Sequence, residues 1–253
     1  ENFRLGRCRG GQKSDYRGGG AGQRGWQPIM IIAVDGWPAA GKGTLSQALA
    51  KHFGYAFLDT GTLYRATALA VLRAGGRLED APTIVQAAQN LDYQTRPLPD
   101  GRWGYWLDGE EVTGALRSPE AGVGASLVAA NLEARTALEG FQRDFAAQHA
   151  VPGVVLDGQD IGTYICPQAP VKFFLRGDIP TLARRRWHDF QARGDSITLA
   201  EVEAALRARI TRDAERPNRP CVPAADAVII DTTHLSAAAV LAQAVGVVDG
   251  QKG

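Results

Sequence analysis

Residues 36–44 read Gly36-Trp37-Pro38-Ala39-Ala40-Gly41-Lys42-Gly43-Thr44. An apolar run over 29–34 precedes this stretch and a helical pattern over 43–53 follows it, which is the strand–loop–helix context of a phosphate-binding loop. Glycines let successive backbone N–H groups turn toward phosphate oxygens, and the helix N-terminus adds positive potential. We therefore expect all nine residues to bind a nucleoside triphosphate, with Lys42 on its β- and γ-phosphates and Thr44 on Mg²⁺. The alternative is a glycine-rich turn without a ligand, which these flanking patterns do not favour.

Length and composition restrict the class of protein. A chain of 253 residues accommodates one domain with an insertion or two small domains. Its hydrophobic content of 45% and charged content of 22% are ordinary for a globular protein. No apolar run reaches the roughly 20 residues that span a bilayer, and the three cysteines and four histidines have no metal-like spacing. We expect a reduced, cytoplasmic location without a disulfide framework, a zinc site or a membrane partner.

The net charge of +1 conceals a basic N-terminal tail. Residues 1–29 contain six basic and two acidic residues without helical or strand periodicity, whereas the remainder contains 22 basic and 25 acidic residues. Such a Gly/Arg-rich tail is either a nucleic-acid-binding segment or a disordered extension. Because Met30 is the one methionine of the chain, we expect it to be the natural start and residues 1–29 to be a spurious extension.

From residue 29 onward, short β-rich runs alternate with helical segments, which predicts an α/β fold with a parallel sheet. The expected strands are 29–34, 56–58, 154–156, 171–175 and 227–230. The expected helices are 43–53, 63–74, 82–90, 119–127, 132–148, 180–191, 199–213 and 237–245. Thr198 and Glu201 form a capping-box pattern, and Ser236 is the expected N-cap of the last helix. Between the second and third strands, turn residues divide 91–112 into short runs, which predicts a small antiparallel meander.

Two strand ends carry polar residues typical of a nucleotide site. The segment Asp59-Thr60-Gly61-Thr62-Leu63-Tyr64-Arg65 follows the second strand. Because the carboxyl ends of parallel strands face the ligand, Arg65 is placed to grip a phosphate. The run over 154–156 ends at Asp157, which is the position of a carboxylate that acts on Mg²⁺ directly or through water.

Arginines are concentrated in the second half of the chain. They are Arg184, Arg185, Arg186, Arg207, Arg209, Arg212, Arg216 and Arg219. Such a set forms a solvated face, a nucleic-acid patch or a mobile lid. In a phosphate-binding protein we favour a lid, because arginines brought in by closure stabilise the charge of a transferring phosphoryl group and exclude water.

Together these motifs resemble the bacterial cytidylate kinase family. The resemblance runs from about Met30 to near the C-terminus. It is carried by the 36–44 loop, spelled Gly-Lys-Gly-Thr as in nucleoside monophosphate kinases, by 59–65, by Asp157-Gly158-Gln159-Asp160-Ile161-Gly162-Thr163, by 170–175 and by 222–227. It implies a P-loop NTPase fold, with a parallel sheet core flanked by helices, an inserted NMP-binding region that contains the small antiparallel sheet, and a helical lid. The implied kinase domain is 30–247, with core 30–62 and 151–247, insert about 63–150 and lid about 184–196.

The resemblance also implies transfer of the γ-phosphoryl group of ATP to CMP or dCMP, with Mg²⁺ held by Thr44 and Asp157. The implied catalytic residues are Lys42, Arg65, Asp157, Asp160, Arg185 and Arg186. The implied CMP-binding residues are Thr60, Arg65, Ser126, Arg135, Gln159, Asp160, Arg209, Asp213 and Arg216. Ser126 and Arg135 match residues that contact cytosine. The expected partners are ATP and CMP or dCMP, without nucleic acid for the core domain, and we expect a monomer.

Gln159 departs from the family, which usually has Arg in Asp-Gly-Arg-Asp. A glutamine still donates a hydrogen bond but carries no charge, so we expect a weakened contact to phosphate. Three alternatives remain open. They are a nucleotide-binding protein with impaired catalysis, a kinase for another acceptor such as UMP, AMP or shikimate, and an RNA-binding protein that uses the tail. Gln159 alone supports the first, and the meander with Ser126, Arg135 and Arg216 opposes the second.

Overall fold

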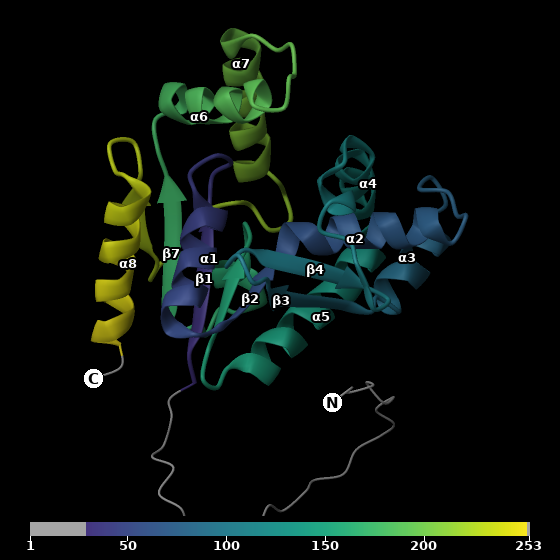
Figure 1. Ribbon diagram of the computed structural model, residues 1–253, viewed down its shortest axis with the longest axis horizontal. Helices are drawn as coiled ribbons and strands as arrows, with labels where there is room; N and C mark the ends of the chain where they lie inside the picture. The colour runs from purple at the N-terminus through teal and green to yellow at the C-terminus, as the bar shows by residue number, and fades with distance from the viewer. Residues whose placement is uncertain (1–28, 252–253) are drawn as a thin grey trace, which may run out of the picture.

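The computed structural model of the protein describes residues 29–251 (Figure 1), so the expectations for the tail, apart from Ile29, fall outside the described residues. Five parallel strands form its central sheet, in the order β2-β6-β1-β7-β8. These strands are β1 (Ile31–Gly36), β2 (Ala56–Asp59), β6 (Val154–Asp157), β7 (Val171–Arg176) and β8 (Val228–Asp231). All five expected strands are confirmed, with ends that differ by one or two residues.

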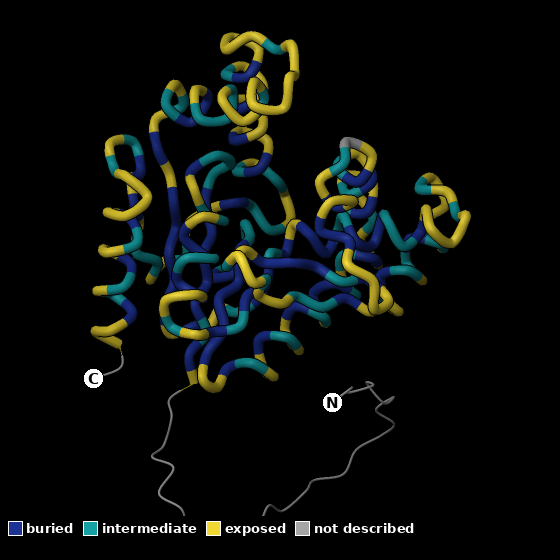
Figure 2. Tube along the Cα trace, viewed as in Figure 1, coloured by how far each residue is buried: buried dark blue, intermediate teal, exposed yellow. Residues whose placement is uncertain are grey.

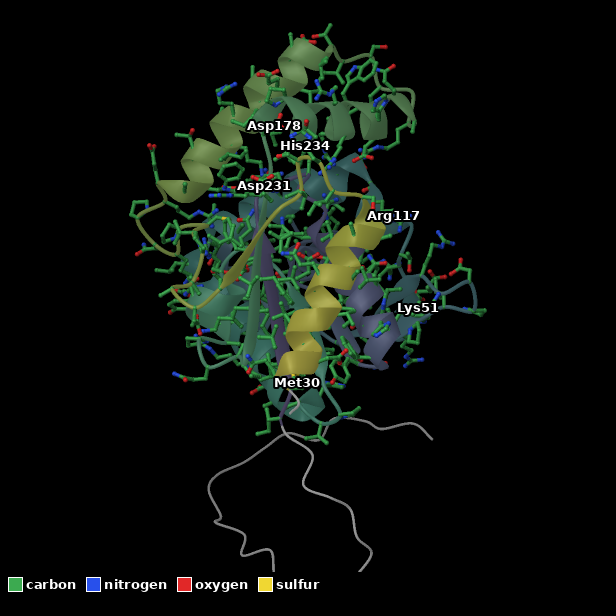
Figure 3. The ribbon with its side chains drawn as sticks, turned by 90° about the vertical axis from the view of Figure 1, so that its left-hand side faces the viewer. Met30, Lys51, Arg117, Asp178, Asp231 and His234 are labelled. Atoms are coloured by element: carbon green, nitrogen blue, oxygen red, sulfur yellow. The ribbon has the colours of Figure 1, made fainter. Side chains whose placement is uncertain are left out.

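The strand register places the candidate site at one edge of the sheet. Val34 of β1 lies opposite Asp157 of β6, and Asp157 lies opposite Asp59 of β2. Because the strands are parallel, their carboxyl ends reach the same edge. Figure 3 shows the polarity of the molecule: Met30 lies at the amino end of the sheet, and Asp178 and Asp231 lie far from it, below the helices of the second half.

Residues 29–251 contain eight α-helices. They are α1 (Lys42–Phe53), α2 (Thr60–Arg73), α3 (Ala81–Gln89), α4 (Pro119–Ala130), α5 (Leu132–His149), α6 (Ile179–Gln191), α7 (Leu199–Ala214) and α8 (Ala237–Gly250). Ile32 and Val34 pack into a core with α1 and α8, whereas Ala33 packs into a second core with α2 and α5. Both faces of the sheet are therefore covered. Figure 2 shows the inner strands β1, β6 and β7 as largely buried, whereas the edge strand β8 is partly exposed. Within 29–251, no helix is both long and apolar enough to cross a membrane.

The expected meander is confirmed as a three-stranded antiparallel sheet. It consists of β3 (Tyr93–Pro97), β4 (Trp103–Leu107) and β5 (Glu110–Glu111), and it lies in the chain between β2 and β6 together with α2 to α5. The capping box of Thr198 and Glu201 and the N-cap at Ser236 are also present. Several features differ from expectation. Helix α8 extends to Gly250 rather than to 245, and α4 extends to Ala130 rather than to 127. Helix α2 begins earlier because the Asp59 carboxylate caps it, accepting from the Gly61 N–H at 3.0 Å. Short helical turns η1 (Ala115–Arg117) and η2 (Ile161–Ile165) interrupt the loops.

Helices α2 and α4 approach each other closely at Gly124. A Cβ atom at this position would lie 2.6 Å from Ala68 Cβ and 2.9 Å from Leu78 Cδ1. Gly140, in the middle of α5, has no atom within 4 Å of the same position. The two helical glycines therefore differ in their surroundings, and only Gly124 is required by packing.

We expect Gly124→Ala to lower the free energy of unfolding by about 1–3 kcal/mol, because the added methyl group overpacks the α2–α4 contact. Gly140→Ala should raise it by up to about 1 kcal/mol, because alanine is the better helix former. Urea denaturation of both variants measures the difference. A Gly124→Ala protein as stable as Gly140→Ala would contradict the close packing.

Asp35, at the end of β1, joins the sheet to η2. Its carboxylate accepts hydrogen bonds from the backbone N–H groups of Ile161 at 2.9 Å and Gly162 at 2.7 Å. Burial raises the pKa of Asp35 to about 6, against the lowering effect of these two bonds. The folded protein thus holds this proton more tightly than the unfolded chain does.

The contribution of Asp35 to the free energy of unfolding is therefore fully present below its ordinary pKa of 3.8 and is lost as the pH rises through about 6. We expect the difference in unfolding free energy between wild type and Asp35→Asn to fall by on the order of 3 kcal/mol between about pH 4 and pH 7. Urea titrations across this range measure it. Asp100 is the control of opposite sign, because bonds from Arg102 lower its pKa. A flat difference for Asp35→Asn would show an ordinary pKa.

Candidate active site

The 36–44 loop requires glycine at its first position. Gly36 has φ 141°, and a Cβ atom there would lie 2.1 Å from the Leu175 carbonyl oxygen. The same oxygen accepts a hydrogen bond from the Trp37 N–H at 2.9 Å, so β7 holds the start of the loop. Gly41, with φ 92°, immediately precedes α1. Pro38, Ala39 and Ala40 lie between Trp37 and Gly41. The loop thus turns from β1 into the N-terminus of α1, as a phosphate-binding loop does.

Lys42 lies across this loop. Its Nζ donates to the Trp37 carbonyl oxygen at 3.0 Å, so the ammonium group spans the turn from α1 back to the start of the loop. Gly43 and Thr44 follow in the first turn of α1, and Thr44 is exposed. An exposed hydroxyl beside an ammonium group at a helix N-terminus suits a bound phosphate and its metal ion.

Asp157 lies against the same helix end. A Cβ atom on Gly43 would be 3.3 Å from Asp157 Oδ2, so the glycine leaves room for the carboxylate. Burial above all, with the charges of Asp59 and Asp35, raises the pKa of Asp157 to about 8, although the charge of Lys42 lowers it. Three carboxyl groups thus crowd the sheet edge near one lysine, and an added cation would relieve their repulsion.

Thr60 and Thr62 hold the end of β2. Thr60 Oγ1 donates to the Asp157 carbonyl oxygen at 2.8 Å, and Thr62 Oγ1 donates to the Asp59 carbonyl oxygen at 2.6 Å. The Thr62 hydroxyl also bonds the Tyr93 hydroxyl of β3. The small sheet of the insert therefore supports the strand end from which Arg65 follows.

Arg65 and Ser126 lie on facing helices of the insert. Arg65 Nη1 donates to the Leu116 carbonyl oxygen at 2.9 Å. A Cβ atom on Gly122 of α4 would lie 3.5 Å from Arg65 Nη1, so α4 presents a glycine to the guanidinium group. Ser126, one turn after Gly122, is exposed and donates to the Gly122 carbonyl oxygen at 3.4 Å. Within residues 29–251, neither the Arg65 nor the Ser126 side chain forms a hydrogen bond or ion pair with a carboxylate.

The Asp213 carboxylate contacts three other residues that were predicted to bind CMP, namely Gln159, Arg209 and Arg216. It accepts from Arg216 Nη2 at 2.9 Å and from Gln159 Nε2 at 3.3 Å, and it lies 3.5 Å from Arg209 Nε. Gln159 Oε1 accepts from Arg216 at 3.2 Å. The Gln159 amide thus donates to the Asp213 carboxylate and accepts from the Arg216 guanidinium. An arginine side chain cannot do both, because it has no hydrogen-bond acceptor.

Asp160 lies among three arginines. Burial raises its pKa, while the charges of Arg135, Arg219 and Arg216 lower it. The buried Nε of Arg135 has no hydrogen-bond partner among residues 29–251. Arg135 therefore combines a charge near Asp160 with a free donor, as a ligand-binding arginine does.

The predicted lid residues divide into two groups. Arg186 of α6 lies near other arginines: burial lowers its pKa, and the charges of Arg193, Arg209 and Arg65 lower it further, although Asp189 opposes them. Arg185 instead donates to the Thr232 hydroxyl at 3.0 Å and to the Thr232 carbonyl oxygen at 2.6 Å. Its guanidinium group thus anchors α6 to the segment after β8.

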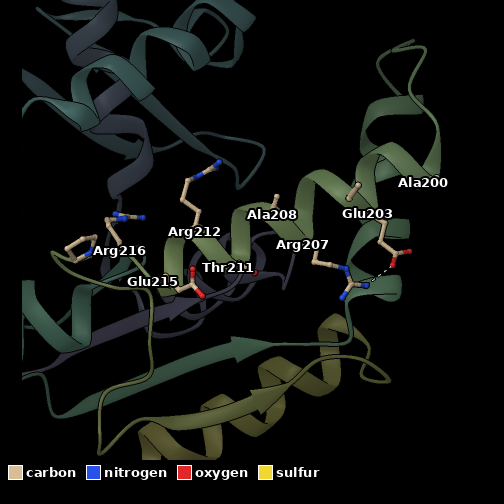
Figure 4. A pocket seen from close by; sticks show the side chains of 10 residues that line it. Ala200, Glu203, Arg207, Ala208, Thr211, Arg212, Glu215 and Arg216 are labelled. Carbon is tan, nitrogen blue, oxygen red and sulfur yellow. Dashed lines mark hydrogen bonds and ion pairs between the residues drawn. The ribbon is translucent and has the colours of Figure 1, made fainter.

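The arginines of the second half do not form one lid face. A groove follows one side of α7, where Arg212 and Arg216 project together and Arg207 pairs with Glu203 at 3.0 Å (Figure 4). Arg219 departs most from the expected lid, because it binds α5 rather than any lid residue. Helical spacing does not predict this, because Arg219 lies beyond the end of α7 and has φ 60°.

Sequence reasoning missed Asp35 and did not assign Asp59 a role in the site. Both are carboxylates at the ends of central strands, and this position was the available signal. Among residues 29–251, no three His, Cys, Asp or Glu side chains converge as a ready metal site. In proteins that bind nucleotides, Mg²⁺ is usually held by one or two carboxylates together with phosphate oxygens and water.

Comparison with known proteins identifies the family. Residues 32–249 match the family described as Cytidylate kinase. Cytidylate kinase of Cereibacter sphaeroides is 43% identical over 220 residues, which cover 87% of this chain and 95% of that protein. Cytidylate kinase of Bradyrhizobium diazoefficiens is 44% identical over 206 residues, covering 81% and 89%, and that of Pasteurella multocida is 41% identical over 215 residues, covering 85% and 93%. With a P-loop, a parallel sheet and the inserted antiparallel sheet in one domain, the chain belongs to the cytidylate kinase family.

Proposed function

We propose that this protein transfers the γ-phosphoryl group of ATP to CMP or dCMP, forming ADP and CDP or dCDP. The observation that carries the proposal is the gathering of positive charge around Arg186 of α6. Arg186 and Arg193 lie over the same Phe190 ring, at 4.8 and 5.3 Å from its centroid, and the charges of Arg193, Arg209 of α7 and Arg65 of the insert lower the pKa of Arg186. Like charges gathered in this way favour an anionic ligand between them. The membership of the chain in its family supports phosphate groups of ATP and CMP as that ligand.

On the donor side, the 36–44 loop and Lys42 would hold the phosphates of ATP. The backbone N–H groups at the start of α1 supply the cradle, and the Lys42 ammonium would exchange its bond to the Trp37 carbonyl oxygen for phosphate oxygens. Thr44 and Asp157 would hold Mg²⁺ together with those oxygens. When bound, the ion neutralises phosphate charge. The hydroxyl and carboxylate oxygens of Thr44 and Asp157 are both suitable ligands for it.

On the acceptor side, α4, α5 and α7 would surround CMP. Arg65 would bind the phosphate of CMP. Asp160 and Asp213 would bind its ribose. Arg209 and Arg216 would contact both the phosphate and the sugar. Ser126 and Arg135 would contact cytosine. Cytosine carries an amino donor beside its N3 and O2 acceptors, so recognition needs an acceptor as well as donors. Uracil reverses one of these groups and would leave a polar group unpaired.

The chemistry needs positioning more than acid–base catalysis. An oxygen of the CMP phosphate attacks the γ-phosphorus and forms a new P–O bond, and the bond from that phosphorus to the β,γ-bridging oxygen breaks. The attacking oxygen is already anionic, so no strong general base is required. Arginines of the lid would stabilise the charge on the moving group and exclude water on closure.

We expect rapid release of ADP from ATP and Mg²⁺ when CMP or dCMP is offered, and at least about 100-fold less with UMP or AMP because of the unpaired polar group. A coupled ADP assay measures each acceptor with the full chain and with a version that starts at Met30. Lys42→Met should abolish turnover, whereas Lys51→Met, at the exposed far end of α1, should retain it. Turnover of UMP or AMP at the rate of CMP would contradict the assigned acceptor.

Gln159→Arg should raise kcat/KM for CMP by about tenfold or more, because a charged hydrogen-bond donor contributes roughly 1.5–3 kcal/mol. Gln159→Met, which removes both hydrogen bonds without adding charge, should lower it. Steady-state kinetics with CMP varied at saturating ATP measure the effect. If Gln159→Arg and wild type have equal kinetics, the missing charge at this position does not limit the enzyme.

A further inference from the structure

Arg219 is an unusual residue outside the set assigned to the substrates. It lies in the segment after α7, and its backbone has φ 60°, which few non-glycine residues adopt. Its side chain is only 11% exposed. A left-handed conformation at a buried arginine persists only where the surrounding contacts hold it.

Two contacts hold Arg219. Its guanidinium forms an ion pair with Glu139 of α5, whose side chain is 5% exposed, and it lies 3.9 Å from the ring centroid of Tyr164 in η2. Arg143 supports the same pair from the outside, 3.8 Å from Glu139 and 5.3 Å from the Tyr164 ring centroid. One arginine thus connects three segments that are far apart in the chain.

Each of the three segments, α5, η2 with its N-cap residue and the stretch after α7, also carries a residue that the proposed function assigns to CMP. These residues lie three or four positions along the chain from Glu139, Tyr164 and Arg219. Glu139 follows Arg135 by four residues on α5, so the two share a helix face. The Tyr164 N–H donates to the Asp160 carbonyl oxygen at 2.9 Å. Arg219 follows Arg216 by three residues, and the Cys221 N–H donates to the Asp213 carbonyl oxygen at 2.8 Å, which closes the turn.

We propose that Arg219 is a positioning residue for the acceptor nucleotide, which through Glu139 and Tyr164 fixes the separation of Arg135, Asp160 and Arg216. The inference rests on the proposed function. Arg219 does not touch substrate, because Glu139 and Tyr164 occupy its guanidinium. It holds Arg135, Asp160 and Arg216 in their relative positions before CMP binds. The binding of CMP therefore does not have to order these side chains.

The test removes this connection without leaving a buried charge. Arg219→Gln alone would strand Glu139, which is costly to a fold, so the main variant is the neutral pair Glu139→Gln/Arg219→Gln. Its matched control is Arg73→Gln/Glu110→Gln, which removes an exposed ion pair of 3.1 Å between α2 and β5. A second variant, Tyr164→Leu, removes the ring but keeps the ion pair, and Tyr164 is 41% exposed and therefore tolerant of change.

We expect the neutral pair to raise KM for CMP about tenfold while KM for ATP changes less than about twofold, because only the acceptor side loses its arrangement. Tyr164→Leu should raise KM for CMP in the same direction, and the control should change neither constant. Equal increases in both KM values, or an unchanged KM for CMP in a folded variant, would overturn the proposal. Wild type that fails to phosphorylate CMP would refute the proposed function itself, whereas active wild type with an unaffected neutral pair refutes only the role of Arg219.

Discussion

The parallel pairing of β1 with β6 determines where the charged groups of the site lie. Val34 opposite Asp157 brings the start of the 36–44 loop beside the Asp157 carboxylate. The pairing of β6 with β2 then adds Asp59, whose carboxylate caps α2 and so directs Arg65. Without these registers, the loop would bind phosphate with no carboxylate nearby, since backbone N–H groups alone cannot hold a metal ion. The sheet thus supplies both halves of a site for phosphate and cation.

The two sides of the site carry opposite imbalances of charge. At the sheet edge, Asp35, Asp59 and Asp157 are crowded near Lys42, and burial with mutual repulsion raises the pKa of Asp157. Across the site, the charges of Arg193, Arg209 of α7 and Arg65 of the insert lower the pKa of Arg186 in α6. A cation relieves the first imbalance and phosphate relieves the second, so each binding event favours the other. This electrostatic arrangement supports the proposal that the site binds a metal–nucleotide complex in preference to either component alone.

Patterns along the chain predicted the strands, the insert and the capping boxes because those features depend on near neighbours. The apolar runs of buried strands and the Thr198–Glu201 cap are examples. Roles that depend on long-range contacts were not accessible in this way. Asp35 is buried, and the N–H groups that satisfy its carboxylate come from Ile161 and Gly162, far along the chain. Arg219 was grouped with lid arginines by composition, whereas a left-handed turn directs it to α5. The roles assigned to Ser126 and Arg135 remain predictions.

Gln159 changes the charge balance that CMP meets. Asp213 is one carboxylate between Arg209 and Arg216, and Gln159 adds hydrogen bonds without charge. The cluster around Asp213 therefore keeps about one net positive charge, whereas a phosphate monoester carries nearly two negative charges near neutral pH. The remaining charge must come from Arg65 on the insert and from the α6 arginines. Because these lie on different elements, the proposed site would be fully neutralised only when the insert and the α6 arginines approach α7 together. A glutamine at this position would therefore tie CMP affinity more closely to closure than an arginine would.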